Sequence, residues 1–422
     1  MVQISAIIGF VLLLLGVPIF LAFSVFGVWI SIYDLKVPWS TVGITMFASI
    51  TSYVLVAVPL FILASMLMLH TGLSRRLVNF FSAWVGHWRA GLAVVMIFSM
   101  GLFGAINGSI IAGIIAIGSV LLPLMEENGY PRPFIAALAA SSAGLESLIP
   151  PSNVAIVFAS VTETSVAKLF ASTVVIGLLQ MTFLTIAVTW ICRKIPKTNP
   201  VPMKERWKAT YKGLPALILP VIILAGIFGG IFTTVEAASV ACLYCLAIGL
   251  ITKTLKLNAI LKALKETVSI TAVIFIIIAT ASMLSLVLIY VQIPQDVTRY
   301  VAAHGLTEKS FLGMAAMGCL ILGTFLEAIP NLLVTASVLE PAASHLHIAM
   351  EWLYPVIAIS VGLGLLTPPV CIGAYTAASM AEVKIGELFR VMFPWLMIPL
   401  LLSLALTVMF PQICTWLPSL IK

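Results

Sequence analysis

The sequence contains little charge. Of its 422 residues, 22 are Lys or Arg and 15 are Asp or Glu, so 9% are charged and 62% are hydrophobic. A soluble protein carries roughly 25% charged residues. The composition therefore excludes a soluble enzyme, a nucleic-acid-binding protein and a secreted disulfide scaffold. It predicts an all-α polytopic membrane protein with on the order of ten spans, at roughly 20 residues per span.

Signatures of catalysis are also missing. The chain has no GxxxxGK[ST] loop for ATP. Its six cysteines lie in or beside apolar runs, where we expect buried small residues, although the CxxC spacing of Cys242 and Cys245 leaves a redox or metal role open. The five histidines fall near loops or hairpin ends. We expect no enzyme, no cofactor, no nucleic-acid partner and no ATP-driven motor.

What the chain does contain is long apolar runs, and two of them are interrupted at mid-length. The runs at 91–125 and 311–345 are longer than a single tilted helix needs. The first is interrupted at 104–109 and the second at 323–331, by small and polar residues. Irregular backbone at membrane depth is tolerated only where it lines a cavity in the protein. Each run is therefore predicted to form a re-entrant helical hairpin.

A proline pair interrupts the apolar run that follows each hairpin. Pro150 and Pro151 interrupt the run at 131–161, and Pro368 and Pro369 interrupt the run at 352–380. Adjacent prolines remove two backbone donors and clash with the preceding turn, so a continuous helix cannot pass through them. We predict two broken transmembrane helices.

The order of these features indicates an internal repeat. The hairpins begin 220 residues apart, the proline pairs lie 218 apart, and the following and preceding spans begin 221 and 222 apart. Loops rich in Lys and Arg at 70–90, 193–212 and 253–265 predict the cytoplasmic side. Threading the chain from these loops places the N-terminus in the cytoplasm and the C-terminus in the periplasm, and gives the two repeats opposite orientations. Inverted repeats with interrupted helices indicate a secondary transporter.

Three stretches mix basic residues with Leu, Val, Trp and Phe at helical spacing. We interpret 74–88, 199–213 and 255–266 as amphipathic helices in contact with lipid headgroups. Plain cytoplasmic loops are the alternative. Glu236, in the sequence TTVEAASV, is predicted to cap the helix that starts there.

Candidate cation sites lie where small polar residues meet interrupted backbone. Where a helix breaks, the first half ends in unpaired carbonyl groups, which attract cations. The second half begins with unpaired N–H groups, which attract anions. The first candidate set is Asn107, Gly108 and Ser109 with Pro150, Pro151, Ser152 and Asn153; the second is Gly323, Thr324, Glu327 and Asn331 with Thr367, Pro368 and Pro369. Helix caps that bind no ligand are the alternative for each polar residue.

Two glutamates are predicted to lie at membrane depth, where ionisable residues are costly and mark functional sites. Glu327 falls at the tip of the second hairpin, where it could ligate Na⁺, stay protonated or form an interhelical hydrogen bond. Glu146 precedes the first proline pair. The alternative to a functional role is that it faces a water-filled cavity and takes no part in coupling ions to a substrate.

The chain resembles the large membrane subunit of tripartite ATP-independent periplasmic (TRAP) transporters over nearly its whole length. The matching stretches are 58–93, 106–138, LIPPSN at 148–153, GGIFTTVEAASVACLY at 229–244, 323–343 and GLLTPPVCIG at 364–373. The resemblance implies an elevator-type, Na⁺-coupled importer of an organic acid in the bacterial inner membrane. It also implies a separate small four-helix membrane subunit and a periplasmic substrate-binding protein as partners.

The resemblance also implies which residues bind Na⁺ and how the chain is divided. The Na⁺ ligands would be residues 107–109 with 150–152, and 323, 324 and 327 with 367–369. We expect the substrate at Asn107, Glu146, Asn153 and Asn331. Residues 1–90 would form scaffold helices and an arm, 91–169 the first hairpin and broken helix of the transport domain, 170–310 scaffold and arm helices, 311–390 the second hairpin and broken helix, and 391–422 a last scaffold helix.

The sequence departs from the family pattern at both of these glutamates. Glu327 stands where the family often has Asp, and Glu146 stands where it commonly has Gly. Glu146 is therefore a candidate ligand for a cationic group of the substrate. A stand-alone ion-coupled carboxylate transporter of related fold is the alternative function, and a channel or a membrane enzyme would show no inverted repeat.

Overall fold

The computed structural model describes residues 8–9, 11–12, 16–107, 109–195 and 200–421, and these residues form helices and connecting segments without any strand. Seven helices among them are long and apolar enough to cross a membrane, which confirms the predicted class. They are Tyr53–His70, Ile110–Glu127, Val166–Lys194, Met203–Phe228, Thr234–Ile251, Leu257–Tyr290 and Ile385–Met409.

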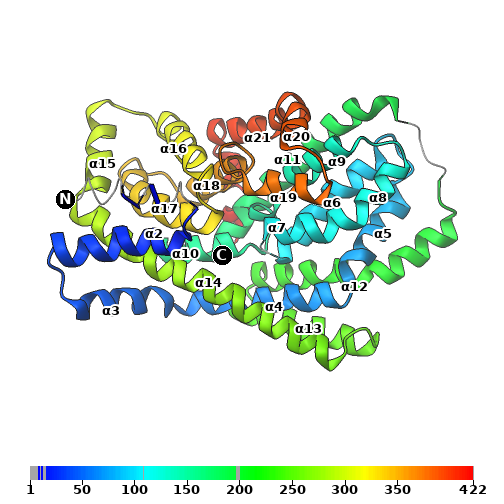
Figure 1. Ribbon diagram of the computed structural model, residues 1–422, viewed down its shortest axis with the longest axis horizontal. Helices are drawn as coiled ribbons and strands as arrows, with labels where there is room; N and C mark the ends of the chain where they lie inside the picture. The colour runs from blue at the N-terminus through cyan, green and yellow to red at the C-terminus, as the bar shows by residue number, and fades with distance from the viewer. Residues whose placement is uncertain (1–7, 10, 13–15, 108, 196–199, 422) are drawn as a thin grey trace.

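Both predicted hairpins are present. The first consists of α6 (Gly91–Asn107), α7 (Ile110–Gly113), the π-helical turn η3 (Ile114–Gly118) and α8 (Ser119–Glu127). The second consists of α16 (Glu308–Gly323) and α17 (Ala328–His345). In Figure 1 the first hairpin lies on the right of the molecule and the second on the left.

The second broken helix lies between the hairpins, and the two halves of the first lie one beside each hairpin (Figure 1). In the first, α9 (Arg132–Ala143) continues into η4 (Gly144–Ser147), and the chain restarts at α10 (Asn153–Thr162). In the second, α18 (Met350–Gly364) ends and α19 (Ile372–Met380) begins. Each interruption contains the predicted proline pair, whose peptide bond is cis.

The remaining helices surround this centre. The long helix α14 (Leu257–Tyr290) packs along α3 (Trp39–Ile50) and α4 (Ala57–His70), as Figure 1 shows. The others are α2 (Ile19–Phe23), η1 (Ser24–Asp34), η2 (Tyr53–Val56), α5 (Leu73–Val85), α11 (Val166–Ile191), η5 (Cys192–Lys194), α12 (Met203–Phe228), α13 (Thr234–Ile251), α15 (Ile293–Ala303), α20 (Ile385–Val391), η6 (Met392–Leu396), α21 (Met397–Met409), α22 (Gln412–Thr415) and η7 (Pro418–Leu420).

Some boundaries differ from the sequence-based expectation. The apolar run at 45–69 is two helices, because α3 ends at Ile50 and the Thr51 hydroxyl donates to the carbonyl of Ala48 (3.1 Å), a local bond that competes with helix continuation. The arms at 199–213 and 255–266 are not separate helices: they are the first turns of α12 and α14. α12 runs without a break through Gly213 and Pro215, at the end of the first arm, and through Pro220. No glycine or proline separates the second arm from the rest of α14.

Two local predictions are confirmed. Glu236 completes a capping box at the start of α13: its Oε2 accepts from the Thr233 backbone N–H (2.8 Å), and the Thr233 hydroxyl accepts from the Glu236 N–H (3.3 Å). All six cysteines are buried and unpaired in disulfides.

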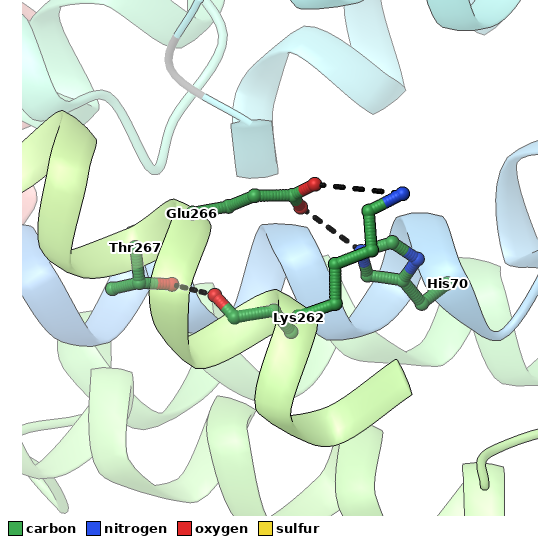
Figure 2. A network of polar contacts seen from close by, with 5 residues as sticks. His70, Lys262, Glu266 and Thr267 are labelled. Atoms are coloured by element: carbon green, nitrogen blue, oxygen red, sulfur yellow. Dashed lines mark hydrogen bonds and ion pairs between the residues drawn. The ribbon is translucent and has the colours of Figure 1, made fainter. Parts of the chain in front are cut away.

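An ion-pair network ties α4 to α14 (Figure 2). Nε2 of His70, the last residue of α4, lies 2.9 Å from Oε2 of Glu266, and Lys262 Nζ lies 3.9 Å from Oε1 of the same carboxylate. Glu266 is thus shared between two basic groups from different helices. The network fastens the last residue of α4 to the N-terminal part of α14.

Candidate functional site

Each hairpin packs onto its own broken helix through glycine. A Cβ atom added to Gly104 of α6 would stand 3.0 Å from Cβ of Glu146. In the second repeat, a Cβ atom added to Gly364 of α18 would stand 2.6 Å from Cα of Gly323. The two contacts occupy equivalent positions in the two repeats. They place the tip of each hairpin directly against interrupted backbone.

The second predicted cation set is assembled at the tip of the second hairpin. The carbonyl of Thr324 accepts from the N–H of Val370, just after the proline pair, at 3.2 Å. The Thr324 hydroxyl donates to the carbonyl of Ile321 (2.8 Å), and the Thr367 hydroxyl donates to that of Leu363 (2.8 Å). The structure therefore brings Gly323 and Thr324 together with the segment that carries Thr367, Pro368 and Pro369.

The first set is described only in part. Asn107 is the last residue of α6, but its side chain and the whole of Gly108 lie outside the described residues. The Ser109 hydroxyl caps α7 by accepting from the Ala112 N–H at 3.4 Å. Pro150, Pro151 and Ser152 are buried in the interruption before α10.

One cavity of about 360 Å³ lies where the interruptions of both repeats meet. Its wall includes residues from the first turns of α7, α10, α17 and α19, and one side of α14 closes it. Glu146 from the first repeat and Glu327 from the second both line it. The sequence singled out each glutamate separately, and the structure shows that they share one cavity.

Glu146 is the unusual member of the wall. It is only 5% exposed, and it forms no hydrogen bond or ion pair with any other residue that the structure describes. No Lys, Arg or His is found among the described residues of the wall, which is otherwise mainly apolar, with hydroxyl groups from Ser109 and Ser269. Glu327 precedes the first turn of α17 and is more exposed than Glu146.

Two predicted substrate residues do not line the cavity. Asn331 is fully buried, and its Nδ2 donates to the carbonyl of Cys319 (2.9 Å), which clamps α17 onto α16. Asn153 is the buried first residue of α10, next to Val154, which does line the cavity. Sequence reasoning missed the contribution of α14, including Ser269 and Ile274, because these residues sit in an apolar run without a break.

The site suits small ions without a dedicated metal cluster. Within the described part of the chain, no group of three or more His, Cys, Asp or Glu side chains could hold a metal. Besides the carboxylates of Glu146 and Glu327, the ligands available to a cation are backbone carbonyl and hydroxyl oxygens at the ends of interrupted helices. Those oxygens are the ones that the hairpin tips provide.

Comparison with known proteins agrees with this architecture. Residues 6–413 match the family model described as "Tripartite ATP-independent periplasmic transporter, DctM component". The chain is 36% identical to the C4-dicarboxylate TRAP transporter large permease protein DctM of Pseudomonas aeruginosa, over 90% of this chain and 89% of that one. It is 32% identical to the ectoine TRAP transporter large permease protein TeaC of Halomonas elongata, over 99% of each chain.

A solved structure shares the fold at lower sequence identity. The YdaH transporter of Alcanivorax borkumensis superimposes with a TM-score of 0.66 at 16% identity, covering 91% of this chain and 90% of that one. The two chains therefore share one fold. The chain belongs to the DctM family of TRAP transporter large permeases, multi-pass membrane transport proteins that work with a small membrane subunit and a periplasmic binding protein.

Proposed function

We propose that this permease imports an organic acid together with Na⁺, and that the hairpins and broken helices move as an elevator against the scaffold. The observation that carries the proposal is the convergence of four interrupted segments, two from each repeat, on one cavity. A cavity built from helix starts and ends can bind ions of both signs without an ATP-driven motor.

The Na⁺ sites are proposed at the two hairpin tips. Na⁺ is a hard cation, so it favours oxygen ligands, as Ca²⁺ and Mg²⁺ do. The last carbonyls of α16, the Thr324 hydroxyl and the Glu327 carboxylate supply such oxygens in the second repeat. The full proposed set is Asn107, Gly108, Ser109, Pro150, Pro151 and Ser152 in the first repeat, and Gly323, Thr324, Glu327, Thr367, Pro368 and Pro369 in the second.

The substrate is proposed to occupy the shared cavity against Glu146. Asn107 and Asn153 flank this position in the chain, and Asn331 would act by holding the start of α17 in place. The two relatives are named for substrates of different charge: a C4-dicarboxylate carries two negative charges, whereas ectoine carries one carboxylate and one amidinium group. Family membership therefore leaves the substrate class open.

The elevator motion is supported by the composition of the cavity wall. The hairpins and the broken helices form every side of the described wall except one, and α14 forms that remaining side. α14 is fastened to α4 through Glu266 and His70, outside the proposed moving part. A shift of the hairpin unit along α14 would carry the cavity across the membrane.

The proposed setting is the bacterial inner membrane, with the N-terminus in the cytoplasm and the C-terminus in the periplasm. The positions of the Lys- and Arg-rich loops support this orientation. A separate small four-helix subunit would complete the scaffold, and a periplasmic binding protein would deliver the substrate.

The test is uptake into proteoliposomes that contain both membrane subunits, with the binding protein added outside. We expect uptake only with an inward Na⁺ gradient. Thr324→Ala should raise the Na⁺ concentration for half-maximal uptake about three- to tenfold, the effect of losing one hydroxyl ligand. Thr182→Ala is the matched control, because Thr182 makes a similar hydroxyl bond to the Leu178 carbonyl on α11. Uptake that ignores the Na⁺ gradient would contradict the proposal.

A further inference from the structure

The cavity has a negative side formed by two carboxylates. Glu146 is nine-tenths buried, lines the cavity and has no hydrogen-bonding or charged partner among the described residues. Glu327 lines the same cavity from the other repeat. A buried carboxylate is strongly disfavoured unless a cation or hydrogen-bond donors compensate it. No described residue supplies that compensation, so it comes either from a proton on the carboxyl group or from an occupant of the cavity such as a cation.

The same cavity has a positive side formed by helix starts. Val154 on α10, Ala328 and Ile329 on α17, and Ile372 and Gly373 on α19 belong to the first turns of their helices and line the wall. The first N–H groups of a helix have no partner within the helix, and the helix dipole makes that end attractive to anions. Three helix starts that meet at one cavity favour a carboxylate there.

A dianion does not match this distribution of charge. One carboxylate of a dianion could lie at the helix starts, but the other would meet Glu146 or Glu327 in a wall whose described residues include no Lys, Arg or His. Like charges in a poorly solvated site repel strongly. A cationic nitrogen at the same place would instead form a charge-assisted hydrogen bond with Glu146.

Na⁺ alone is a weaker occupant for the position at Glu146. The proposed Na⁺ ligands gather at the hairpin tips, where carbonyl oxygens end α16. Glu146 lies on the 3₁₀ turn η4, directly after α9, and packs against Gly104 of α6. It is therefore not one of the carbonyl-rich helix ends that favour Na⁺. The volume of about 360 Å³ also lies within the range of small-molecule sites, about 300 to 1,000 Å³.

We propose that this permease carries a zwitterionic organic acid, whose cationic nitrogen is held by Glu146 with Glu327 nearby and whose carboxylate lies at the starts of α10, α17 and α19. This inference rests on the proposed function, because it assumes that the shared cavity is the substrate site. It adds the charge class of the substrate, and it identifies Glu146 as the residue that selects it.

The first test is a ligand screen of the cognate binding protein by thermal shift. The screen covers zwitterions, monoanions, dianions and cations, and it includes four-carbon compounds matched in length: 4-aminobutyrate, butyrate, succinate and 1,4-diaminobutane. The strongest ligand is then measured in uptake with both membrane subunits. We expect this ligand to carry a carboxylate and a cationic nitrogen. A strongest ligand without a cationic group would overturn the inference.

The second test asks whether Glu146 selects the charge. Glu146→Gln keeps the shape of the side chain but removes its charge, and it should raise the substrate concentration for half-maximal uptake by about tenfold or more. Glu146→Asp should retain part of the affinity. The matched control is Glu387→Gln, an exposed glutamate on α20 away from the cavity. Unchanged uptake in Glu146→Gln would contradict the inference.

The two proposals can fail separately. Na⁺-driven uptake of succinate or another acid without a cationic group would uphold the proposed function and overturn the zwitterion. Uptake of a zwitterion that requires Glu146 but is independent of the Na⁺ gradient would uphold the zwitterion and overturn Na⁺ coupling.

Discussion

Gly144 of the first repeat and Gly362 of the second lie against each other at the centre of the molecule. A Cβ atom on Gly362 would stand 3.9 Å from Cα of Gly144. The two positions are 218 residues apart, the same separation as the proline pairs. Equivalent residues of two repeats can touch in this way only near their symmetry axis. The two broken helices therefore cross at the pseudo-symmetry axis, which places both interruptions beside one cavity.

The glycine contacts in the second repeat predict a clear effect on stability. Gly364→Ala places a Cβ atom 2.6 Å from both Cα of Gly323 and the carbonyl oxygen of Leu320, so backbone has to move. We expect a loss of about 1–3 kcal/mol, as for other overpacked cores. The measurement is thermal unfolding of the purified membrane complex.

A second glycine provides the control for this substitution. Gly313 lies on α16, and an added Cβ atom there would have no neighbour within 4 Å. Gly313→Ala should leave the melting temperature unchanged or raise it slightly, because alanine favours the helix. Equal destabilisation by both substitutions would show that α16 and α18 do not meet at Gly364.

The cap of α13 predicts a smaller effect. Thr233→Ala removes the hydroxyl that accepts from the Glu236 N–H, and loss of an N-cap of this kind costs about 1 kcal/mol. Thr234→Ala, one residue later and inside the helix, is the matched control and should change the melting temperature less. A larger effect from Thr234→Ala would contradict the assigned cap.

The network in Figure 2 predicts a stability effect that depends on salt. Glu266→Gln removes the charge that pairs with His70 and Lys262, at a cost of no more than about 1 kcal/mol for a partly exposed pair. Lys262→Met should cost less, because its contact is longer. Thermal unfolding should show the difference from the unsubstituted protein shrinking as salt is raised. A difference independent of salt would indicate lost packing instead.

Local sequence features predicted much of the architecture. Proline pairs and mid-run polar residues stop a helix wherever they occur, so the hairpins and broken helices could be located from sequence alone. The lengths of α12 and α14 could not be predicted, because a basic amphipathic segment followed by an apolar one can form either two helices or one continuous helix. The break after Ile50 depends on a local competition between backbone and hydroxyl bonds that single residues do not reveal.

The candidate site was predicted as parts and not as a whole. Glu146 and Glu327 stood out because charge is rare in this chain, but their shared cavity arises from packing between repeats more than 200 residues apart. Asn331 was a reasonable candidate as a polar residue in a hairpin, and the structure shows its amide engaged by Cys319. The face of α14 carries no sequence signal, because all of its cavity-lining residues except Ser269 are ordinary apolar ones.

The most direct test of the central claim is protection of the cavity by substrate. All six native cysteines are buried, so a single introduced cysteine can be labelled with a maleimide over a low background. In the proteoliposome system, Ile329→Cys, in the cavity wall, should be labelled several-fold more slowly when Na⁺ and the substrate are both present. Met314→Cys, on the same hairpin but outside this cavity, should be unaffected. Equal labelling of Ile329→Cys with and without substrate would contradict the account.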